Sequence, residues 1–107
     1  MSEPIQVILK QGGPAYSGLI TFDGVILEVF GFATQGSRRF HIATIERVEL
    51  SFKSGMLATP TFKVNGRIGG GLSEVQAVKP DEREQGELIA LAEAVNTEAE
   101  KYEGITQ

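Results

Sequence analysis

The sequence contains no cysteine, no tryptophan and only one histidine. Without cysteine the chain can form no disulfide, thiolate metal site or cysteine nucleophile, and this composition fits a reducing cytoplasm. The single histidine, His41, cannot by itself supply a typical zinc site. No stretch approaches the roughly 18 consecutive apolar residues of a membrane span, and a start with Glu3 and no basic cluster argues against a secretory signal. We therefore expect a cytoplasmic protein with no membrane span, metal or other cofactor.

Basic residues are in the minority, and acidic residues are concentrated towards the end of the sequence. Residues 81–103 carry eight acidic and two basic side chains, a net charge of −6, which leaves +2 for the rest of a chain whose total is −4. Binding to DNA or RNA depends on an accumulated positive surface. We therefore expect no nucleic-acid partner.

The first apolar stretch alternates as in a β-strand, with Ile5, Val7 and Leu9 on one face. A Gly-Gly-Pro break follows it. Residues 1–14 are therefore expected to form an extra edge strand or a loosely held arm. Such a strand can cap the chain's own sheet or donate itself to a neighbouring copy, and in the second case Ile5, Val7 and Leu9 are candidate interface residues.

Two dipeptides indicate tight turns between strands. Asp23-Gly24 separates two apolar runs, which predicts a hairpin with strands at 17–22 and 25–32. A primed hairpin turn needs positive φ at both central residues, which Asp tolerates and Gly adopts freely. Asn65-Gly66 follows the strand predicted at 59–65, and we expect a second turn of the same kind there.

One stretch changes its alternation midway. Phe40 and Ile42 are in phase, and so are Val48 and Leu50, but Ile45 falls out of phase with the first pair. A one-residue slip would reverse every side chain of a strand. Because no core residue is lost here, the shift predicts a tight corner with Ile45 on its inside, joining two strands.

The last segment has the period of an α-helix. Its apolar stripe recurs at spacings of four and three and comprises Leu88, Ala92, Val95, Ala99 and Tyr102. Leu91 widens the stripe, and Asp81 with Glu84 resembles a capping box. Gly86 weakens the first turn by roughly 1 kcal/mol relative to Ala. We therefore place the firm start of the helix at Glu87.

These elements predict an α+β fold over residues 1–107, which an apolar content of 41% can support as a single domain. About seven short antiparallel strands form a bent sheet or partly open β-barrel, whose core spans residues 15–80. One C-terminal amphipathic helix, within residues 81–103, caps the open end.

The order and wording of these elements resemble the bacterial pleckstrin-homology-like (PH-like) domains that are associated with short C-terminal oligomerisation tails. The resemblance covers roughly residues 15–103, and the segments that carry it are Gly18, Phe22-Asp23-Gly24-Val25, Ile42–Val48, Thr61-Phe62-Lys63-Val64 and Leu88–Leu91. Ala43 stands where this family often has a proline. The resemblance implies a PH-like fold and a role in binding or scaffolding.

Catalytic motifs are lacking. His41 lies between Phe40 and Ile42, where a strand should point it away from the core, and no serine has the context of an activated nucleophile. The glycine-rich run at 68–74 lacks the GxxxxGK[ST] pattern and the following helix of a phosphate-binding loop. We therefore expect a protein that is not an enzyme.

Protein binding is the function that these features favour, with a second copy of the chain as one candidate partner. A sheet edge or a helix-flanked groove can accept an extended peptide as an added strand. The alternative is a weak anion or lipid-headgroup site formed by Arg38, Arg39 and Lys53, although exposed basic residues on strands are also common edge protection. A small-molecule ligand in the mouth of the sheet is a third possibility.

Overall fold

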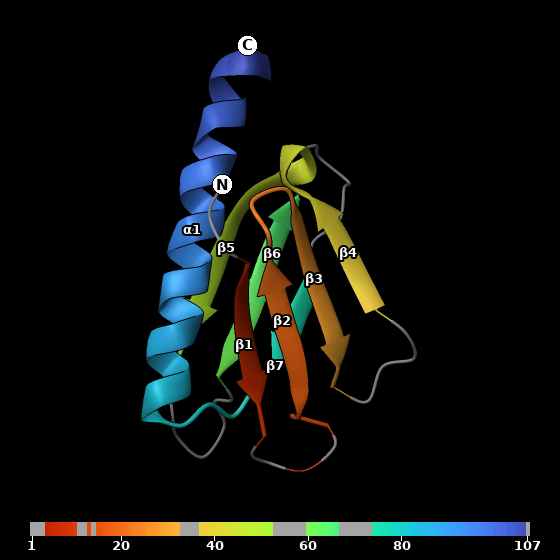
Figure 1. Cartoon of the computed structure of the whole chain (residues 1–107), viewed down its shortest axis with the longest axis vertical. Coiled ribbons are helices and arrows are strands. Elements are labelled where there is room, and N and C mark those ends of the chain that lie inside the picture. The colour runs from red at the N-terminus through yellow and green to blue at the C-terminus, as the bar shows by residue number, and fades with distance from the viewer. Residues whose placement is uncertain are drawn as a thin grey trace.

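The computed structural model describes residues 4–10, 13, 15–32, 37–52, 60–66 and 74–106, with side chains up to Tyr102. Within these residues, seven β-strands, one short 3-10 helix and one α-helix make an α+β fold (Figure 1). In chain order these are β1 (Ile5–Leu9), β2 (Gly18–Phe22), β3 (Ile26–Gly31), β4 (Ser37–His41), η1 (Ile42–Thr44), β5 (Ile45–Ser51), β6 (Thr61–Gly66), β7 (Glu74–Ala77) and α1 (Glu82–Thr106).

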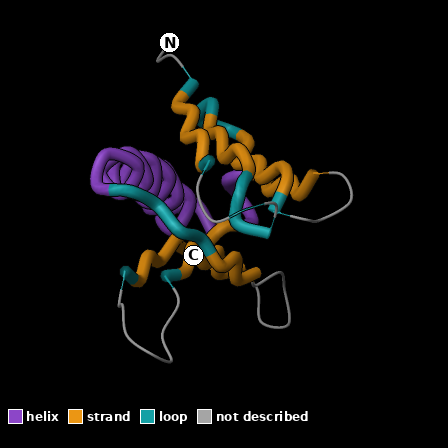
Figure 2. The backbone as a smooth tube through the Cα atoms, turned by 90° about the horizontal axis from the view of Figure 1, so that it is seen from below, coloured by secondary structure: helices purple, strands orange, loops and turns teal. Residues whose placement is uncertain are grey.

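The strands form two antiparallel sheets rather than one. The first has the order β1-β2-β3-β4 and the second the order β5-β6-β7. The predicted α+β fold with antiparallel strands and one C-terminal helix is confirmed, but the single continuous sheet is not, because the described residues contain no β-ladder that joins the two sheets. Figure 2 shows the two sheets facing each other, with α1 between them on one side.

The change of sheet occurs at the predicted corner. Ile42 begins η1 and Ile45 begins β5, and both side chains are fully buried. The ladder between β5 and β6 is irregular between Ile45 and Arg47, as expected where a strand changes phase. Val48 is buried on the following strand. The corner thus keeps its apolar residues in the core while the backbone passes from one sheet to the other.

The predicted hairpin between β2 and β3 is confirmed, but its turn does not have positive φ at both Asp23 and Gly24. Asp23 donates its N–H to the carbonyl of Ile26 at 3.3 Å, so Gly24 and Val25 are the central residues. Gly24 has φ +99°, whereas Asp23 is not among the residues with positive φ. The Asp23 carboxylate instead accepts the N–H groups of Val25 at 2.8 Å and Ile26 at 2.7 Å. Asp23 therefore stabilises the turn through its side chain.

A second predicted turn is wrong. Asn65 and Gly66 lie inside β6, where they pair with Arg47 and Ile45 of β5. Pairing with the neighbouring strand has overridden the local turn preference. β6 still pairs antiparallel with β7, but the connection between them lies outside the described residues.

Gly18, at the start of β2, is required by close packing. The ring of Phe32 and the carbonyl of Phe30 would both collide with a Cβ at this position. Phe32 itself has φ +58° and is buried, and its N–H donates to the carbonyl of Ser17 at 2.8 Å. A glycine here lets the end of β3 fold its aromatic side chain back onto the core.

Helix α1 starts earlier than Gly86 suggested, at Glu82. Its start is a reciprocal capping box: Glu84 donates its N–H to the Asp81 carboxylate at 2.7 Å, and Asp81 donates its N–H to the Glu84 carboxylate at 2.9 Å. The apolar stripe is confirmed: Leu88, Leu91, Ala92, Val95 and Ala99 are buried, and Tyr102 packs against the core.

Candidate functional site

Each sheet has two edge strands at which a partner could bind. These are β1 and β4 in one sheet and β5 and β7 in the other. An edge strand presents backbone N–H and C=O groups that can pair with another chain. α1 packs beside β1 and β5, on one side of the two sheets (Figure 2). β4 and β7 lie on the other side.

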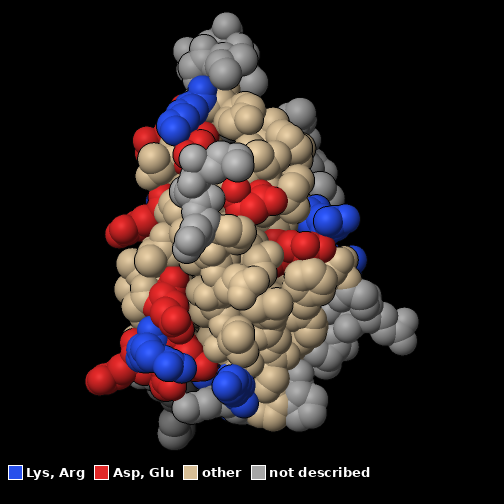
Figure 3. Space-filling view, viewed as in Figure 1, with Lys and Arg blue, Asp and Glu red and all other residues tan. Residues whose placement is uncertain are grey.

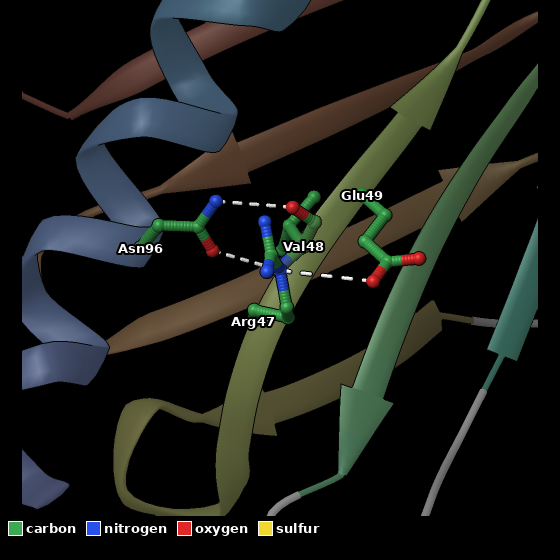
Figure 4. Close-up of polar contacts among 4 residues, drawn as sticks. All are labelled: Arg47, Val48, Glu49 and Asn96. Atoms are coloured by element: carbon green, nitrogen blue, oxygen red, sulfur yellow. Dashed lines mark hydrogen bonds and ion pairs between the residues drawn. The ribbon is translucent and has the colours of Figure 1, made fainter.

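The edge of β5 is occupied by a side chain of α1 (Figure 4). Val48 donates its N–H to Oδ1 of Asn96 at 2.6 Å, and Nδ2 of Asn96 donates to the carbonyl of Val48 at 3.0 Å. The amide thus bonds both backbone groups of one residue, as a neighbouring strand would. Arg47 and Glu49, on the other face of β5, form an exposed ion pair with 3.7 Å between Nε and Oε1.

The side of α1 that faces β1 is hollowed. A hollow of about 370 Å³ has an apolar floor that includes Ile5, Phe22 and Ala94, and Glu93 and Glu98 lie at its edge. A smaller hollow of about 210 Å³ is lined by Gln6, Ile8, Lys10, Arg83 and Glu87. We call these two hollows together the β1–α1 groove.

Asp23 adds a negative charge near the larger hollow, since it directly precedes Gly24 in its lining. Hydrogen bonds from the N–H groups of Ile26 and Val25 lower the pKa of the Asp23 carboxyl from its ordinary value. The carboxylate therefore stays charged at neutral pH.

A second groove, which we call the β4–β7 groove, separates the free edges of the two sheets. Its volume is about 340 Å³, and its apolar lining includes the side chains of Val29, Phe40, Phe62 and Val64. Arg38 of β4, and Glu74, Val75 and Gln76 of β7, complete it. Nε of Arg38 lies 3.2 Å from Oε1 of Glu74, which joins the two edges by an ion pair between half-exposed side chains.

Two of the three residues of the candidate anion patch, Arg38 and Arg39, do not share a face of their sheet. Arg38 and Arg39 are neighbours on β4 and so point to opposite faces of the sheet. Arg38 pairs with Glu74, and Nε of Arg39 lies 2.9 Å from the Glu28 carboxylate. Lys53 lies outside the described residues.

The candidate interface residues belong to the chain's own core. β1 pairs antiparallel with β2, and Val7 and Leu9 are buried while Ile5 packs against the core. β1 therefore caps the chain's own sheet, which is the first of the two roles expected for this strand. Gln6 and Ile8 are the exposed side chains of β1, together with its outer backbone edge.

His41 has a structural contact. Its Nδ1 accepts the N–H of Ala43 at 3.0 Å, and its carbonyl accepts the Thr44 hydroxyl at 2.7 Å, so it caps η1. Within the described residues no three His, Asp or Glu side chains are grouped as metal ligands would be. In the same part of the chain, α1 is too polar to cross a membrane and no other helix is long enough.

Sequence reasoning missed Asn96, Glu74 and Gln76. Asn96 was detectable in part, as a polar residue directly beside the apolar stripe at Val95. Glu74 and Gln76 gave no signal, because a short strand of mixed polarity does not reveal which neighbour it faces.

Comparison of the chain with protein-family models, curated proteins and solved structures found no significant match.

Proposed function

We propose that this chain is a non-enzymatic, cytoplasmic PH-like binding module that takes up an extended segment of another protein as an added strand in the β4–β7 groove. The observation that carries the proposal is the position of the two free edges. β4 ends one sheet and β7 ends the other, and an apolar groove lies between them. The two stacked antiparallel sheets with a C-terminal helix also support the PH-like assignment.

The groove suits an extended peptide. Its rims are strand edges, which pair with an added strand through backbone hydrogen bonds. Phe40, Phe62 and Val64 form its apolar floor and are at most 5% exposed. Every second side chain of a bound peptide would point towards this floor, since alternate side chains of a strand point to one face. The specificity would then come from Arg38 and Glu74 at the rims.

The ion pair across the groove is no obstacle to binding. Arg38 and Glu74 are 57% and 42% exposed, and exposed ion pairs contribute about 0–1 kcal/mol. A bound segment can therefore separate them and offer each a new partner. Arg38 and Arg39 point to opposite faces and each has a carboxylate, which favours a protein ligand over the anion or lipid-headgroup alternative.

The test is selection of binders from a displayed library of random linear peptides, with the full chain as bait. Gln76→Trp fills the groove, and Gln6→Trp makes the same change on the edge strand of the opposite side. We expect selected peptides to bind at least about tenfold more weakly to Gln76→Trp and equally well to Gln6→Trp.

Amide chemical shifts of the unaltered chain provide a second readout that does not depend on how the variants fold. On titration with a selected peptide, the largest changes should fall in β4 and β7. Binders that compete with one another but perturb only α1, or that ignore Gln76→Trp when this variant is folded, would overturn the proposal. A library that yields no binder, with a metabolite screen that shifts the melting temperature, would favour a small ligand in its place.

A further inference from the structure

We infer that the β1–α1 groove is where a second copy of this chain docks, with the β1 strands of the two copies paired antiparallel about a two-fold axis at Val7. This surface is separate from the β4–β7 groove and leaves that groove free. Three observations carry the inference: the chemistry of the β1 edge, the direction in which it opens, and the charges at its two ends.

Of the four edge strands, β1 has the fewest features that would hinder pairing with another strand. Its sequence, Ile-Gln-Val-Ile-Leu, contains no charge, proline or glycine. The other edge on the α1 side, β5, is bonded by Asn96, and the edge strands β4 and β7 carry the charged residues Arg38, Arg39 and Glu74. Side-chain cover blocks pairing, and charged side chains restrict it to a strand with complementary charges. An edge without them is suited to pairing with another strand.

The outer backbone edge of β1 points away from α1. Figure 2 shows α1 on the inner side of the four-stranded sheet, between the two sheets, and not in line with it. A strand added to β1 would therefore extend this sheet and pass over the hollows beside α1. Ile8, 51% exposed, would gain a covering neighbour.

The charges along the groove are self-complementary. Lys10 and Arg83 lie at one end, in a hollow that Glu87 also lines. Glu93 and Glu98 line the other end together with Ile5, and Nζ of Lys101 lies 3.0 Å from the Glu98 carboxylate. Figure 3 shows basic side chains at the lower end of α1 and β1 with acidic ones among them, further acidic side chains along the helix above, and a basic side chain near its upper end.

A two-fold axis reverses the direction of β1 in one copy relative to the other. The basic end of one groove therefore meets the acidic end of the groove in the second copy. Centred on Val7, the pairing sets Gln6 opposite Ile8 of the second copy and Ile5 opposite Leu9 of the second copy. Lys10 then meets the end of the groove that holds Ile5, where Glu93 and Glu98 are. This complementarity favours a second copy over an unrelated strand, because each groove carries both the basic end and the acidic end that the pairing brings together.

The interface is small, since each copy contributes one five-residue strand and the sides of a groove. Interfaces below about 1,200 Å² are typical of transient complexes. We therefore expect a dimer whose population rises with concentration and falls with salt. Sedimentation velocity on the full chain over a wide concentration range, at low and high salt, measures both.

A charge swap locates the contact. Lys10→Glu with Arg83→Glu makes both ends acidic, and Glu93→Lys with Glu98→Lys makes both ends basic. We expect each double variant alone to dimerise at least tenfold more weakly than the unaltered chain, and an equimolar mixture of the two to recover the original dimer within threefold. A chain that stays monomeric throughout, or a dimer indifferent to both double variants, would overturn the inference.

The register is tested by cross-linking, because the chain has no cysteine of its own. Directly opposed residues of an antiparallel pair have Cα atoms about 4.5–5.5 Å apart, within the range of a disulfide. A mixture of Gln6→Cys and Ile8→Cys chains should give at least threefold more disulfide-linked dimer than either chain alone. Equal yields from all three samples would exclude this pairing.

Discussion

The two sides of the sandwich fill the space between the sheets with different kinds of side chain. On the side of β1 and β5, α1 supplies a continuous apolar stripe in which Leu88, Leu91 and Val95 are fully buried. On the side of β4 and β7, the residues of β7 that line the groove are Glu74, Val75 and Gln76, and two of the three are polar. One side is part of the core, and the other presents polar groups above an apolar floor.

This difference separates stability from binding within one small domain. Burial of apolar side chains is the main stabilising contribution to a fold. Apolar clefts with a few directed polar groups are the usual form of a binding site. Changes in the apolar stripe of α1 should therefore alter the free energy of unfolding, whereas changes of the polar groups at the rims of the β4–β7 groove should alter binding with little effect on stability.

The largest expected effect is at the centre of the helical stripe. Leu91→Ala should lower the free energy of unfolding by about 2–5 kcal/mol, because it removes a fully buried side chain and leaves a cavity. The matched change on the open side, Gln76→Ala, should lie within about 0.5 kcal/mol of the unaltered chain. Equilibrium denaturation with urea measures both, and equal losses would contradict the division between the two sides.

A smaller loss is expected at the β5 edge. Asn96→Ala leaves the N–H and C=O of Val48 without the two bonds that the amide makes, and should cost about 1–3 kcal/mol. The amide hydrogen of Val48 should also exchange faster with solvent. Thr97→Ala, at the exposed neighbouring position, is the control and should change stability by less than about 0.5 kcal/mol. Unchanged exchange at Val48 in Asn96→Ala would show that the contact does not guard the edge.

Features that depend on neighbouring residues were readable from the sequence. The corner at Ile42 and Ile45, the stripe around Leu88 and the Asp81–Glu84 capping box all follow from local spacing, and the structure confirms them. Local signals also failed where tertiary pairing was stronger. The Asn-Gly turn became part of β6, and the helix began before its glycine because the capping box fixes its first turn.

Features that depend on distant residues were not readable. The bond between Val48 and Asn96 joins residues 48 positions apart, and the β4–β7 groove exists only because the chain splits into two sheets. Arg38 and Arg39 looked like one patch because they are adjacent in sequence. Strand alternation sends them to opposite faces, where Glu74 and Glu28 meet them separately. A sequence shows which residues are available, but the pairing of sheet edges decides which of them meet.

The smallest expected effect concerns the ion pair across the groove. A double-mutant cycle with Arg38→Ala and Glu74→Ala should give a coupling energy of about 0–1 kcal/mol that falls with added salt. The cross-strand pair of Arg39 and Glu28 is the internal reference, since its Glu28 side chain is only 17% exposed and its atoms are closer, at 2.9 Å. We expect its coupling to be the larger of the two. The opposite order would mean that Arg38 and Glu74 hold the edges of β4 and β7 together, and a peptide would then have to break a strong contact before it could enter the groove.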